Sequence, residues 1–542
     1  MGSLRRAMAH ILFRLQGARS ACHAQRMGTT RGRAGKPRQT DIDTTDIDAP
    51  DTDADDTALD EARFGLWRTR RRLSAKHVVT FGQFIVATAL VAGAVWLARE
   101  NLALFWLILR AVAWVAFTGA IVLRLFAAGA SLTLPEPPAK RWTDPLPVYT
   151  VLCPLRREAA SVPGLAAALR NLDYPAERLD VKIIIEADDA ETAEALENTA
   201  LPAGYEIVHV PVASPRTKPK ALNYALTQAR GAFVTVYDAE DVPHPQQLRA
   251  ALDAFASGGA RLGAVQAPLL VDNGRSSWLA GQFAAEYAIQ FCGIVPLLAH
   301  LGAPPPLGGT SNHFRREALE DTGAWDPFNV TEDADLGYRL ARSGWRIGAI
   351  ASPTWEEAPA RLVPWIRQRA RWIKGHLQTW LVLMRDPLRT IREMGLGAFL
   401  AMQVVLGGGL LAAMAHLPLL GALMFAVAAP GFSISAADWT LVISGYATAT
   451  LAALFAAAVQ RDRRLAIAAL TMPFYWPLSS LAALPAVFDL FFRTHYWAKT
   501  DHGRTPRNTP HQWTLPPPSP SSSSQPRSSP SAPGAAPSPP IR

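Results

Sequence analysis

Apolar residues are concentrated in two parts of the chain. They dominate residues 78–127 and 395–492, and these two blocks bracket a mixed region at about 140–390. A helix needs about 20 predominantly apolar residues to cross a bilayer. The pattern therefore predicts membrane spans on both sides of a soluble domain, and it excludes a protein that is soluble throughout.

The first apolar block has the form of a helical hairpin. Val78–Leu97 and Leu102–Leu125 are separated by a short polar turn at 99–101. A connection of this length joins two antiparallel helices. We therefore expect a transmembrane hairpin over residues 76–130.

The second apolar block predicts further membrane helices over residues 393–495. Its apolar stretches lie at about 395–428, 439–459 and 465–492. Prolines interrupt the last stretch and disturb helix geometry there. One kinked span, two short spans, and a span with an interfacial helix are all compatible with that stretch.

Basic residues set the expected orientation. They flank the hairpin at 68–76 and 140–141, and they fill the short loop at 461–464. Lys and Arg accumulate on the cytoplasmic side of membrane spans. We therefore expect a multi-pass protein of the inner (plasma) membrane, with the domain at 140–390 in the cytoplasm and an even number of crossings, most simply two, between 395 and 459.

Both ends of the chain are poor in the residues that build a core. Residues 1–40 carry bases without an acid, and residues 41–61 carry acids without a base. Such segregated charge is typical of disorder, so we expect residues 1–75 to form a disordered charged tail. The Pro/Ser-rich stretch at 504–542 predicts a second disordered tail.

Composition narrows the class of protein further. The 542 residues carry 54 basic and 45 acidic side chains, a formal net charge of +9. No basic helix with interleaved aromatic residues accompanies this charge in the central region, so we expect membrane lipids and no nucleic acid among the partners. Three cysteines exclude a disulfide-stabilised fold, and none stands in a metal-binding pair.

The central region alternates between short apolar runs and amphipathic stretches. The runs predict strands at 148–153, 181–185, 205–210, 233–237 and 262–266. The stretches between them predict helices at 162–171, 191–196, 219–230 and 245–255. This alternation predicts an α/β domain with a mostly parallel sheet and helices on both faces. Ligands of such sheets bind at the carboxyl ends of the strands.

Two of the predicted strands end in acidic residues. Asp238, Glu240 and Asp241 follow one strand, and Asp188 and Asp189 follow another. Carboxylates gathered at one sheet edge repel one another unless a cation lies between them. A divalent metal (Mg or Mn) that shares its site with substrate phosphate fits such an edge.

Two lysines strengthen this interpretation. Lys218 and Lys220 open the predicted helix that leads to the Asp238 strand. A lysine at a helix N-terminus is unfavourable for the helix dipole but well placed for an anion bound there. Together with the acidic strand ends, the lysines favour a nucleoside diphosphate over a solvated acidic turn.

A third acidic motif begins another predicted helix. In Thr331–Leu340, Thr331 is a candidate N-cap, and Glu332 and Asp333 lie in the first turn. The helix dipole favours negative charge there. We therefore expect Asp333 to be ionised at neutral pH, as a general base must be.

A basic, aromatic helix is expected near residues 362–384. Gln368, Arg371 and Trp372 share one of its faces, because they lie three and four positions apart. Arginine supplies planar donors for phosphate oxygens, and tryptophan offers a flat face for a sugar ring. The same helix has the composition of one that lies at the membrane surface. Both interpretations stay open.

The order of these motifs resembles that of one family. Acidic strand end, lysine, Asp-x-Glu, Thr-Glu-Asp and Gln-x-x-Arg-Trp follow one another within about 145–390, with apolar blocks on both sides. The combination resembles the membrane-integrated family 2 glycosyltransferases, the group that contains bacterial cellulose synthase. The resemblance implies an α/β domain of the GT-A type beside an α-helical transmembrane bundle.

The resemblance also implies roles for single residues. Asp333 would be the catalytic base, and Asp238 and Glu240 would hold the metal. The donor nucleotide sugar would be contacted by Asp188 (or Asp189, the register alternative), Lys218, Asp238, Gln368 and Arg371. The acceptor would be contacted by Trp372 and Glu332. Glu240 stands where the family pattern has Asp, which leaves Glu240 and Asp241 as alternatives for the second metal ligand.

These features together predict an inverting, metal-dependent hexosyltransferase. We expect it to move sugar from a nucleotide sugar onto a growing β-linked polysaccharide whose export is coupled to synthesis. Transfer of a single sugar to a lipid carrier is the alternative. A nucleotide-sensing transporter or receptor is disfavoured, because the spans show no convincing ion pairs in the sequence and a sensor needs no base at Asp333.

Overall fold

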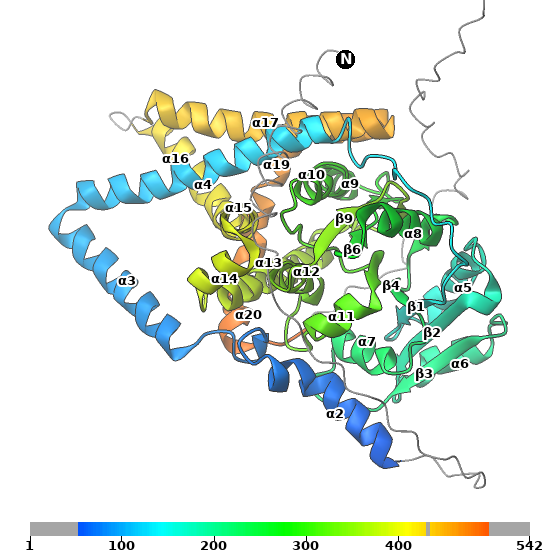
Figure 1. The fold of residues 1–542 in the computed structure, drawn as a ribbon. Helices are drawn as coiled ribbons and strands as arrows, with labels where there is room; N and C mark the ends of the chain where they lie inside the picture. Colours follow the sequence, from blue (N-terminus) through cyan, green and yellow to red (C-terminus); the bar gives the residue numbers. More distant parts are fainter. Residues whose placement is uncertain (1–51, 430–433, 498–542) are drawn as a thin grey trace, which may run out of the picture. The chain divides into compact units, whose positions relative to one another are not determined.

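The computed structural model describes residues 52–429 and 434–497. Within them, the central sheet has seven strands in the order β3-β2-β1-β4-β8-β6-β9 (Figure 1). The strands are β1 (Tyr149–Pro154), β2 (Leu179–Glu186), β3 (Tyr205–Val210), β4 (Phe233–Val236), β6 (Leu262–Gln266), β8 (Asn312–Arg315) and β9 (Arg346–Ala349). Only β8 runs antiparallel to its neighbours β4 and β6. The prediction of an α/β domain with a mostly parallel sheet is confirmed.

Helices cover both faces of this sheet. The helices of the two faces are α5 (Val162–Arg170), α6 (Ala190–Glu197) and α8 (Gln247–Gly258) on one side, and α7 (Lys218–Leu226) and α11 (Arg316–Thr322) on the other. Leu169 and Leu252 pack on the first face, and Leu222 and Leu319 pack on the second. Strands buried on both faces are rich in apolar residues, which is why the positions of most of these strands could be predicted.

The sheet has a switch point at its centre. The strand β1 lies between β2 and β4, so the carboxyl ends of these three strands open toward one crevice. A second, three-stranded sheet in the order β5-β10-β7 stands beside that crevice. Its strands are β5 (Val242–Pro243), β7 (Leu269–Val271) and β10 (Thr354–Glu356). They are too short to show a periodic pattern, and the sequence did not predict them.

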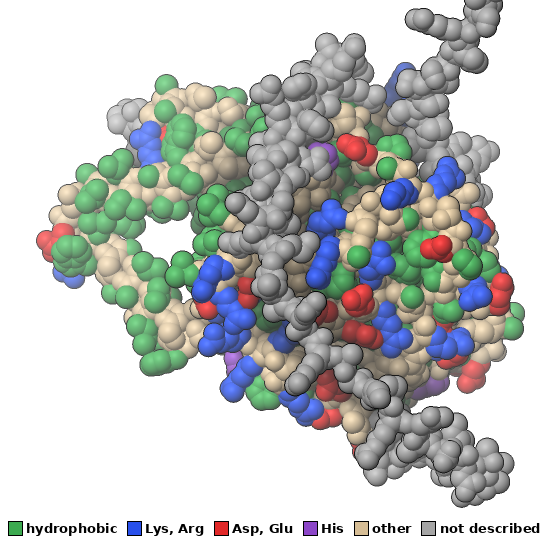
Figure 2. All heavy atoms as spheres, in the orientation of Figure 1, with side chains coloured by type: hydrophobic (Ala, Val, Ile, Leu, Met, Phe, Trp, Pro, Cys, Tyr) green, Lys and Arg blue, Asp and Glu red, His purple; other side chains and the backbone are tan. Residues whose placement is uncertain are grey.

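In the described residues, six helical segments are long and apolar enough to cross a membrane. They are Phe81–Glu100, Leu102–Ala130, Trp278–His300, Leu396–Ala426, Ala436–Gln460 and Met472–Phe492. The first segment, helix α3, buries none of its residues in the protein, and Leu90 on it is 69% exposed. Figure 2 shows hydrophobic side chains gathered over α3 and its neighbour α4 (Leu102–Ala130), whereas charged side chains lie mainly over the sheet domain. An exposed apolar surface of this kind is suited to contact with lipid.

The third segment, Trp278–His300, was not predicted as a span. It consists of α9 (Trp278–Ile289), a π-helical turn η5 (Gln290–Ile294) and α10 (Val295–His300). About half of its apolar window is buried inside the protein. It packs through alanines against α17 (Ala436–Gln460) and α18 (Arg463–Leu470). The segment thus joins the sheet domain to the C-terminal helices.

The C-terminal block contains two long helical segments before the basic loop, in agreement with the expected pair. They are α15 (Leu396–Met402), the π-helical turn η6 (Gln403–Gly408) and α16 (Gly409–Ala428) in one run, followed by α17. The last block is broken into α18, α19 (Met472–Tyr475) and α20 (Leu478–Phe492). Of the three alternatives, a kinked segment Met472–Phe492 preceded by the short amphipathic helix α18 describes it best.

The prediction of disorder over residues 1–75 is wrong for residues 52–75. Thr52–Thr69 form helix α2, and Ala75–His77 form a further helical turn. Leu59, Ala62 and Leu66 are buried, the first two against α7 and its neighbours. The acidic run concealed this apolar stripe at helical spacing. Residues 1–51 and the tail predicted at 504–542 lie outside the described residues.

One ion pair links two of the candidate spans near a helix end. Arg110 of α4 lies 2.8 Å from the carboxylate of Asp438 in the first turn of α17. Trp114 donates to the same carboxylate at 2.8 Å. Arg110 and Asp438 are 328 positions apart in the chain, so the sequence gives no hint of their pairing. They tie α4 to α17 near a helix end.

Candidate active site

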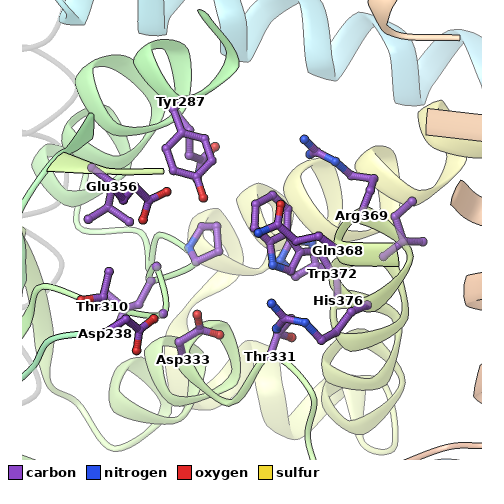
Figure 3. Close-up of a pocket in the computed structure, with 18 of the residues that line it drawn as sticks. Asp238, Tyr287, Thr310, Thr331, Asp333, Glu356, Gln368, Arg369, Trp372 and His376 are labelled. Atoms are coloured by element: carbon purple, nitrogen blue, oxygen red, sulfur yellow. The ribbon is translucent and has the colours of Figure 1, made fainter. Parts of the chain in front are cut away.

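One cavity of about 480 Å³ joins the crevice of the sheet to the apolar helices. Its polar end is lined by residues from the carboxyl ends of β2 and β4, from α12 (Glu332–Arg342) and from α13 (Leu362–Leu383). Its other end is lined by residues of α4, η5, η6, α16 and α20. Figure 3 shows Asp238 and Asp333 on one side of the polar end, with Gln368 and Trp372 of α13 opposite them.

Lys218 and Asp238 form an ion pair at the polar end. The Lys218 ammonium donates to the Asp238 carboxylate and, at 2.8 Å, to the carbonyl of Gly309. Burial acts to lower the pKa of Lys218, but Asp238 and Glu332 outweigh it and hold that pKa above its usual range. Lys218 is therefore a positive charge held at the start of α7.

The two alternatives for the second metal ligand lie in different surroundings. Glu240 lines the cavity. Asp241 is buried behind Asp238, where it accepts hydrogen bonds from the Asp238 amide at 2.7 Å and from the Thr310 hydroxyl. Burial raises the pKa of Asp241 well above its usual range. The geometry favours Glu240 as the residue that reaches a ligand.

These carboxylates fit a divalent metal that is shared with the substrate. Among residues 52–429 and 434–497, no group of three or more His, Cys, Asp or Glu side chains forms a closed metal cage. Asp238 and Glu240 together offer carboxylate oxygens on the cavity wall. Mg²⁺ is commonly bound by one or two carboxylates, with phosphate and water completing its shell. The donor set therefore suits Mg or Mn bound together with a diphosphate.

Glu332 and Asp333 lie side by side at the start of α12, on the cavity wall. Burial, and next the charge of Asp333, raise the pKa of Glu332 to about 8. Burial also raises the pKa of Asp333, while the Ala334 amide (2.8 Å), Lys218 and Arg371 act against that rise. Glu332 therefore takes the proton at neutral pH, and Asp333 is the carboxylate of the pair.

The sequence argument about Asp333 considered only the helix dipole, which lowers a carboxyl pKa, and it missed burial. The structure gives the opposite direction, because the carboxyl is enclosed between α12, α7 and α13. A base with a raised pKa accepts a proton more strongly, as long as it is ionised. The site remains suited to a general base, for a different reason.

The protonated Glu332 predicts a pH dependence of stability. A carboxyl whose pKa is raised in the folded state stabilises that state fully below its unfolded pKa, and this contribution is lost as pH rises through about 8. Between about pH 5 and pH 9, the unfolding midpoint of the wild-type protein should fall relative to that of Glu332→Gln by about 2 °C or more. Parallel midpoints across that range would contradict the assignment of the proton to Glu332. Thermal unfolding in one detergent at a fixed scan rate measures both proteins.

Gln368, Arg371 and Trp372 of α13 all line the cavity. Arg371 donates to the carbonyl of Val330 at 3.3 Å, and its Nε atom is buried without a partner. Trp372 packs against Phe283 and Tyr287, with ring centroids 5.8 Å and 6.2 Å away. Much of the tryptophan ring is thus held by the protein itself, which limits the face that it offers to a sugar.

Asp188 and Asp189 are not among the residues that line the cavity. The Asp188 carboxylate is half-exposed and paired with Arg216. Asp189 is buried, caps α6 through Thr192 and accepts from the Arg157 amide. Asp189 therefore has a structural task, and Asp188 is the better placed of the two to meet a ligand.

Several residues of the cavity were missed from the sequence. Glu286 of α9 accepts two hydrogen bonds from Arg369, the nearer pair at 2.5 Å, and one from Tyr475 at 2.8 Å. Trp497, beyond the last apolar block, lines the cavity under the guanidinium of Arg371. Both π-helical turns, η5 and η6, also contribute lining residues. Such turns are rare and recur at functional sites, but no sequence signal marks them here.

Comparison with known proteins finds similarity to glycosyltransferases. Residues 147–375 match the model of the glycosyltransferase like family 2. A beta-monoglucosyldiacylglycerol synthase of Synechocystis sp. is 29% identical over 304 residues, which are 54% of this chain and 62% of that protein. A poly-beta-1,6-N-acetyl-D-glucosamine synthase of Staphylococcus aureus is 26% identical over 250 residues, which are 46% of this chain and 58% of that protein.

Among solved structures, one partial match covers most of the chain. It is a mannosyltransferase from Pyrobaculum calidifontis in complex with GDP-Man and Mn²⁺, with a TM-score of 0.44 and 22% identity, covering 70% of this chain and 99% of that one. The matched segments of the curated relatives amount to less than two thirds of their lengths. Residues 147–375, which hold every residue that the sequence proposed for the site, form a domain of the glycosyltransferase-like family 2.

Proposed function

We propose that the protein transfers a sugar, with inversion, from a cytoplasmic nucleotide sugar to an acceptor that reaches the site from the membrane. The observation that carries this proposal is one cavity with both polar and apolar walls. One end is lined by Lys218, Asp238 and Asp333, and the other end is lined by apolar helices of membrane-spanning length. A charged donor matches the polar end of the cavity, and an amphiphilic acceptor matches the apolar end.

At the polar end, the diphosphate of the donor would lie between α7 and α13. Lys218 and Arg371 supply its positive charges, and the Arg371 Nε proton still lacks an acceptor. Asp238 and Glu240 would hold a divalent cation, which supplies charge for the leaving diphosphate when it is bound. Asp188 stays our proposed contact for the nucleotide base, and Gln368 our proposed contact for the donor sugar.

Asp333 would act as the general base. Its carboxylate lies at the junction of the donor end with the rest of the cavity, close enough to Gly309 that a Cβ there would lie 3.3 Å from Oδ2. From that position it can remove the proton of an acceptor hydroxyl while the diphosphate departs on the opposite side of the sugar. Glu332 and Trp372 would position the acceptor beside it.

The apolar end favours a lipid acceptor. Its walls include Ile294, Val405, Leu410 and Ala413, side chains that solvate an acyl or isoprenoid chain better than a sugar polymer. The glucosyldiacylglycerol synthase among the relatives has a lipid product by its name. A growing polysaccharide is the second candidate, favoured by Trp372 in the cavity and by the relative that is a poly-N-acetylglucosamine synthase.

The test supplies the purified full-length protein with radiolabelled nucleotide sugars, Mn²⁺ or Mg²⁺, and a total membrane lipid extract. The lipid proposal expects labelled product that partitions into organic solvent and grows by one sugar. Label in a water-soluble polymer that lengthens with time would establish the polysaccharide candidate. Release of nucleoside diphosphate without any labelled product would contradict both.

The contact between α12 and α13 provides a specific prediction. A Cβ on Gly375 of α13 would lie 2.4 Å from the Oγ1 atom of Thr331 and 2.8 Å from its Cβ. Gly375→Ala should therefore displace α13 from α12 and lower the transfer rate about tenfold or more, because a shift of about 1 Å costs up to about 10²-fold. Initial rates measure the loss.

Two further variants separate this effect from a general effect of alanine. Adding Thr331→Ala removes the Oγ1 and Cγ2 atoms and should restore part of the rate. Gly164→Ala on α5 meets no atom within 4 Å and should leave the rate unchanged. An unaltered rate in Gly375→Ala would show that the spacing of α12 and α13 is not critical.

A further inference from the structure

Arg124 brings an arginine side chain to the apolar end of the cavity. It lies in the second candidate span, helix α4, and it lines the cavity together with residues of η5 and α16. Its guanidinium carbon lies 5.5 Å from the centroid of the Trp476 ring. An ionisable residue on a membrane-spanning helix is costly, and such residues commonly mark functional sites.

The surrounding protein does not pair this charge. Within the part of the chain that the structure describes, no hydrogen bond or ion pair closes on the Arg124 guanidinium. The acid that acts on it is Glu286, but that carboxylate is already held by both terminal nitrogens of Arg369 and by the Tyr475 hydroxyl. The charges of Glu286 and Arg369 cancel, so Arg124 leaves one positive charge in excess.

Another arginine on the same helix shows the difference. Arg110 pairs with Asp438 at 2.8 Å and donates to the Ser435 hydroxyl at 2.7 Å. A guanidinium removed from bulk water needs partners of this kind. Instead of such partners, the Arg124 guanidinium has the face of the Trp476 ring and the open space of the cavity beside it.

The neighbourhood of Arg124 is apolar on the membrane side. Ile294, Val405 and Leu410 line the same end of the cavity, and His416 is tied to the Tyr446 hydroxyl at 3.0 Å. A cation beside such walls suits an amphiphile whose head is anionic and whose tail is hydrocarbon. The diphosphate of the donor is not the candidate, because Lys218 and Arg371 serve it at the other end.

We propose that Arg124 binds an anionic, phosphate-type headgroup of a lipid that occupies the apolar end of the cavity. The identification of this lipid as the acceptor rests on the proposed function. The binding of the lipid does not, because it can be measured without sugar transfer. Guanidinium is suited to the task, because its planar donors match phosphate oxygens in pairs.

The test compares two probes that differ only in the phosphate. Farnesyl phosphate and farnesol are added to the purified full-length protein in a neutral detergent, and bound lipid is counted by native mass spectrometry. The wild-type protein should retain farnesyl phosphate at about tenfold lower concentration than farnesol, the scale of one charge-assisted hydrogen-bonded contact. Arg124→Gln should lose this preference, and Arg124→Lys should keep part of it.

Arg110→Gln is the matched control, with the same substitution on the same helix outside the cavity, and it should keep the preference. Each variant must keep the unfolding midpoint of the wild type; if Arg124→Gln does not, the Arg124→Lys comparison carries the test. Equal retention of both probes by the wild type, or an undiminished preference in Arg124→Gln, overturns the proposal. Inorganic phosphate that displaces farnesyl phosphate at comparable concentration shows a site for free phosphate and overturns the lipid assignment.

The result is separable from the proposed function. Failure to detect sugar transfer with any donor would contradict the proposed function but leave the binding comparison intact. Conversely, transfer to a neutral lipid at a rate that Arg124→Gln does not change would leave the function standing and overturn Arg124 as a headgroup site for the acceptor.

Discussion

Replacing Asp333 with asparagine is expected to lower the rate of sugar transfer by at least about 10²-fold, the usual cost of a lost general base. Asparagine keeps the size of the side chain and an oxygen that can accept from the Ala334 amide, as Asp333 does at 2.8 Å. It removes the carboxylate that takes the proton. Because Lys218 and Arg371 remain in place, donor nucleotide should bind with near-normal affinity.

Initial rates and calorimetric nucleotide binding test the two halves of this expectation on the same preparation. Glu332→Gln is the informative companion, because Glu332 shares the cavity wall and holds a proton at neutral pH. It should keep most of the rate if Asp333 is the base. A rate above about a tenth of the wild-type value in Asp333→Asn, together with a collapse in Glu332→Gln, would move the base to Glu332.

The strands of the domain were predictable because of their burial. β2 and β4 are covered on both faces, so their side chains are mainly apolar, and both strands end close to the predicted positions. The buried Lys182 of β2 is an exception, and it pairs with Asp180 and Glu206. The acidic residues after β4 then had to lie at the switch point, since parallel strands present their carboxyl ends to one edge. Lys218, which opens the helix before β4, could be expected beside the same ligand. The place of Asp333 there was implied only by the resemblance to the family 2 glycosyltransferases.

What the sequence concealed depends on contacts between distant segments. The charge of residues 41–61 outweighed the apolar spacing of Leu59, Ala62 and Leu66, which only the surface of α7 makes meaningful. The pKa of Asp333 depends on its burial beside α13. The sequence of α12 alone indicates only the effect of the helix dipole on that pKa. The position of Arg124 on a cavity wall follows only from the packing of α4 against η5 and α16.

The second large effect is expected at the metal ligands. Asp238→Asn should lower the transfer rate by about 10²–10³-fold, the scale on which loss of one electrostatic stabiliser of developing charge lowers kcat. Excess chelator should abolish transfer by the wild-type protein, and Mn²⁺ or Mg²⁺ should restore it. Unchanged transfer in excess chelator would remove the metal from the mechanism.

Asp238 has two proposed roles, as a metal ligand and as the ion-pair partner of Lys218. The experiment must distinguish them. Loss of the ion pair alone would weaken the hold on Lys218 but leave the metal requirement unchanged, so rates are measured as a function of Mn²⁺ concentration. Glu240→Gln keeps the Lys218–Asp238 pair and removes only the second ligand; it should need more Mn²⁺ for half-maximal rate while approaching a substantial maximum. Asp238→Asn should not recover at any Mn²⁺ concentration. The metal assignment is contradicted if Glu240→Gln shows the wild-type Mn²⁺ dependence and Asp238→Asn recovers with added metal. In that case the role of Asp238 is to hold Lys218 against the diphosphate. The cation, where it is needed, is then held chiefly by the substrate.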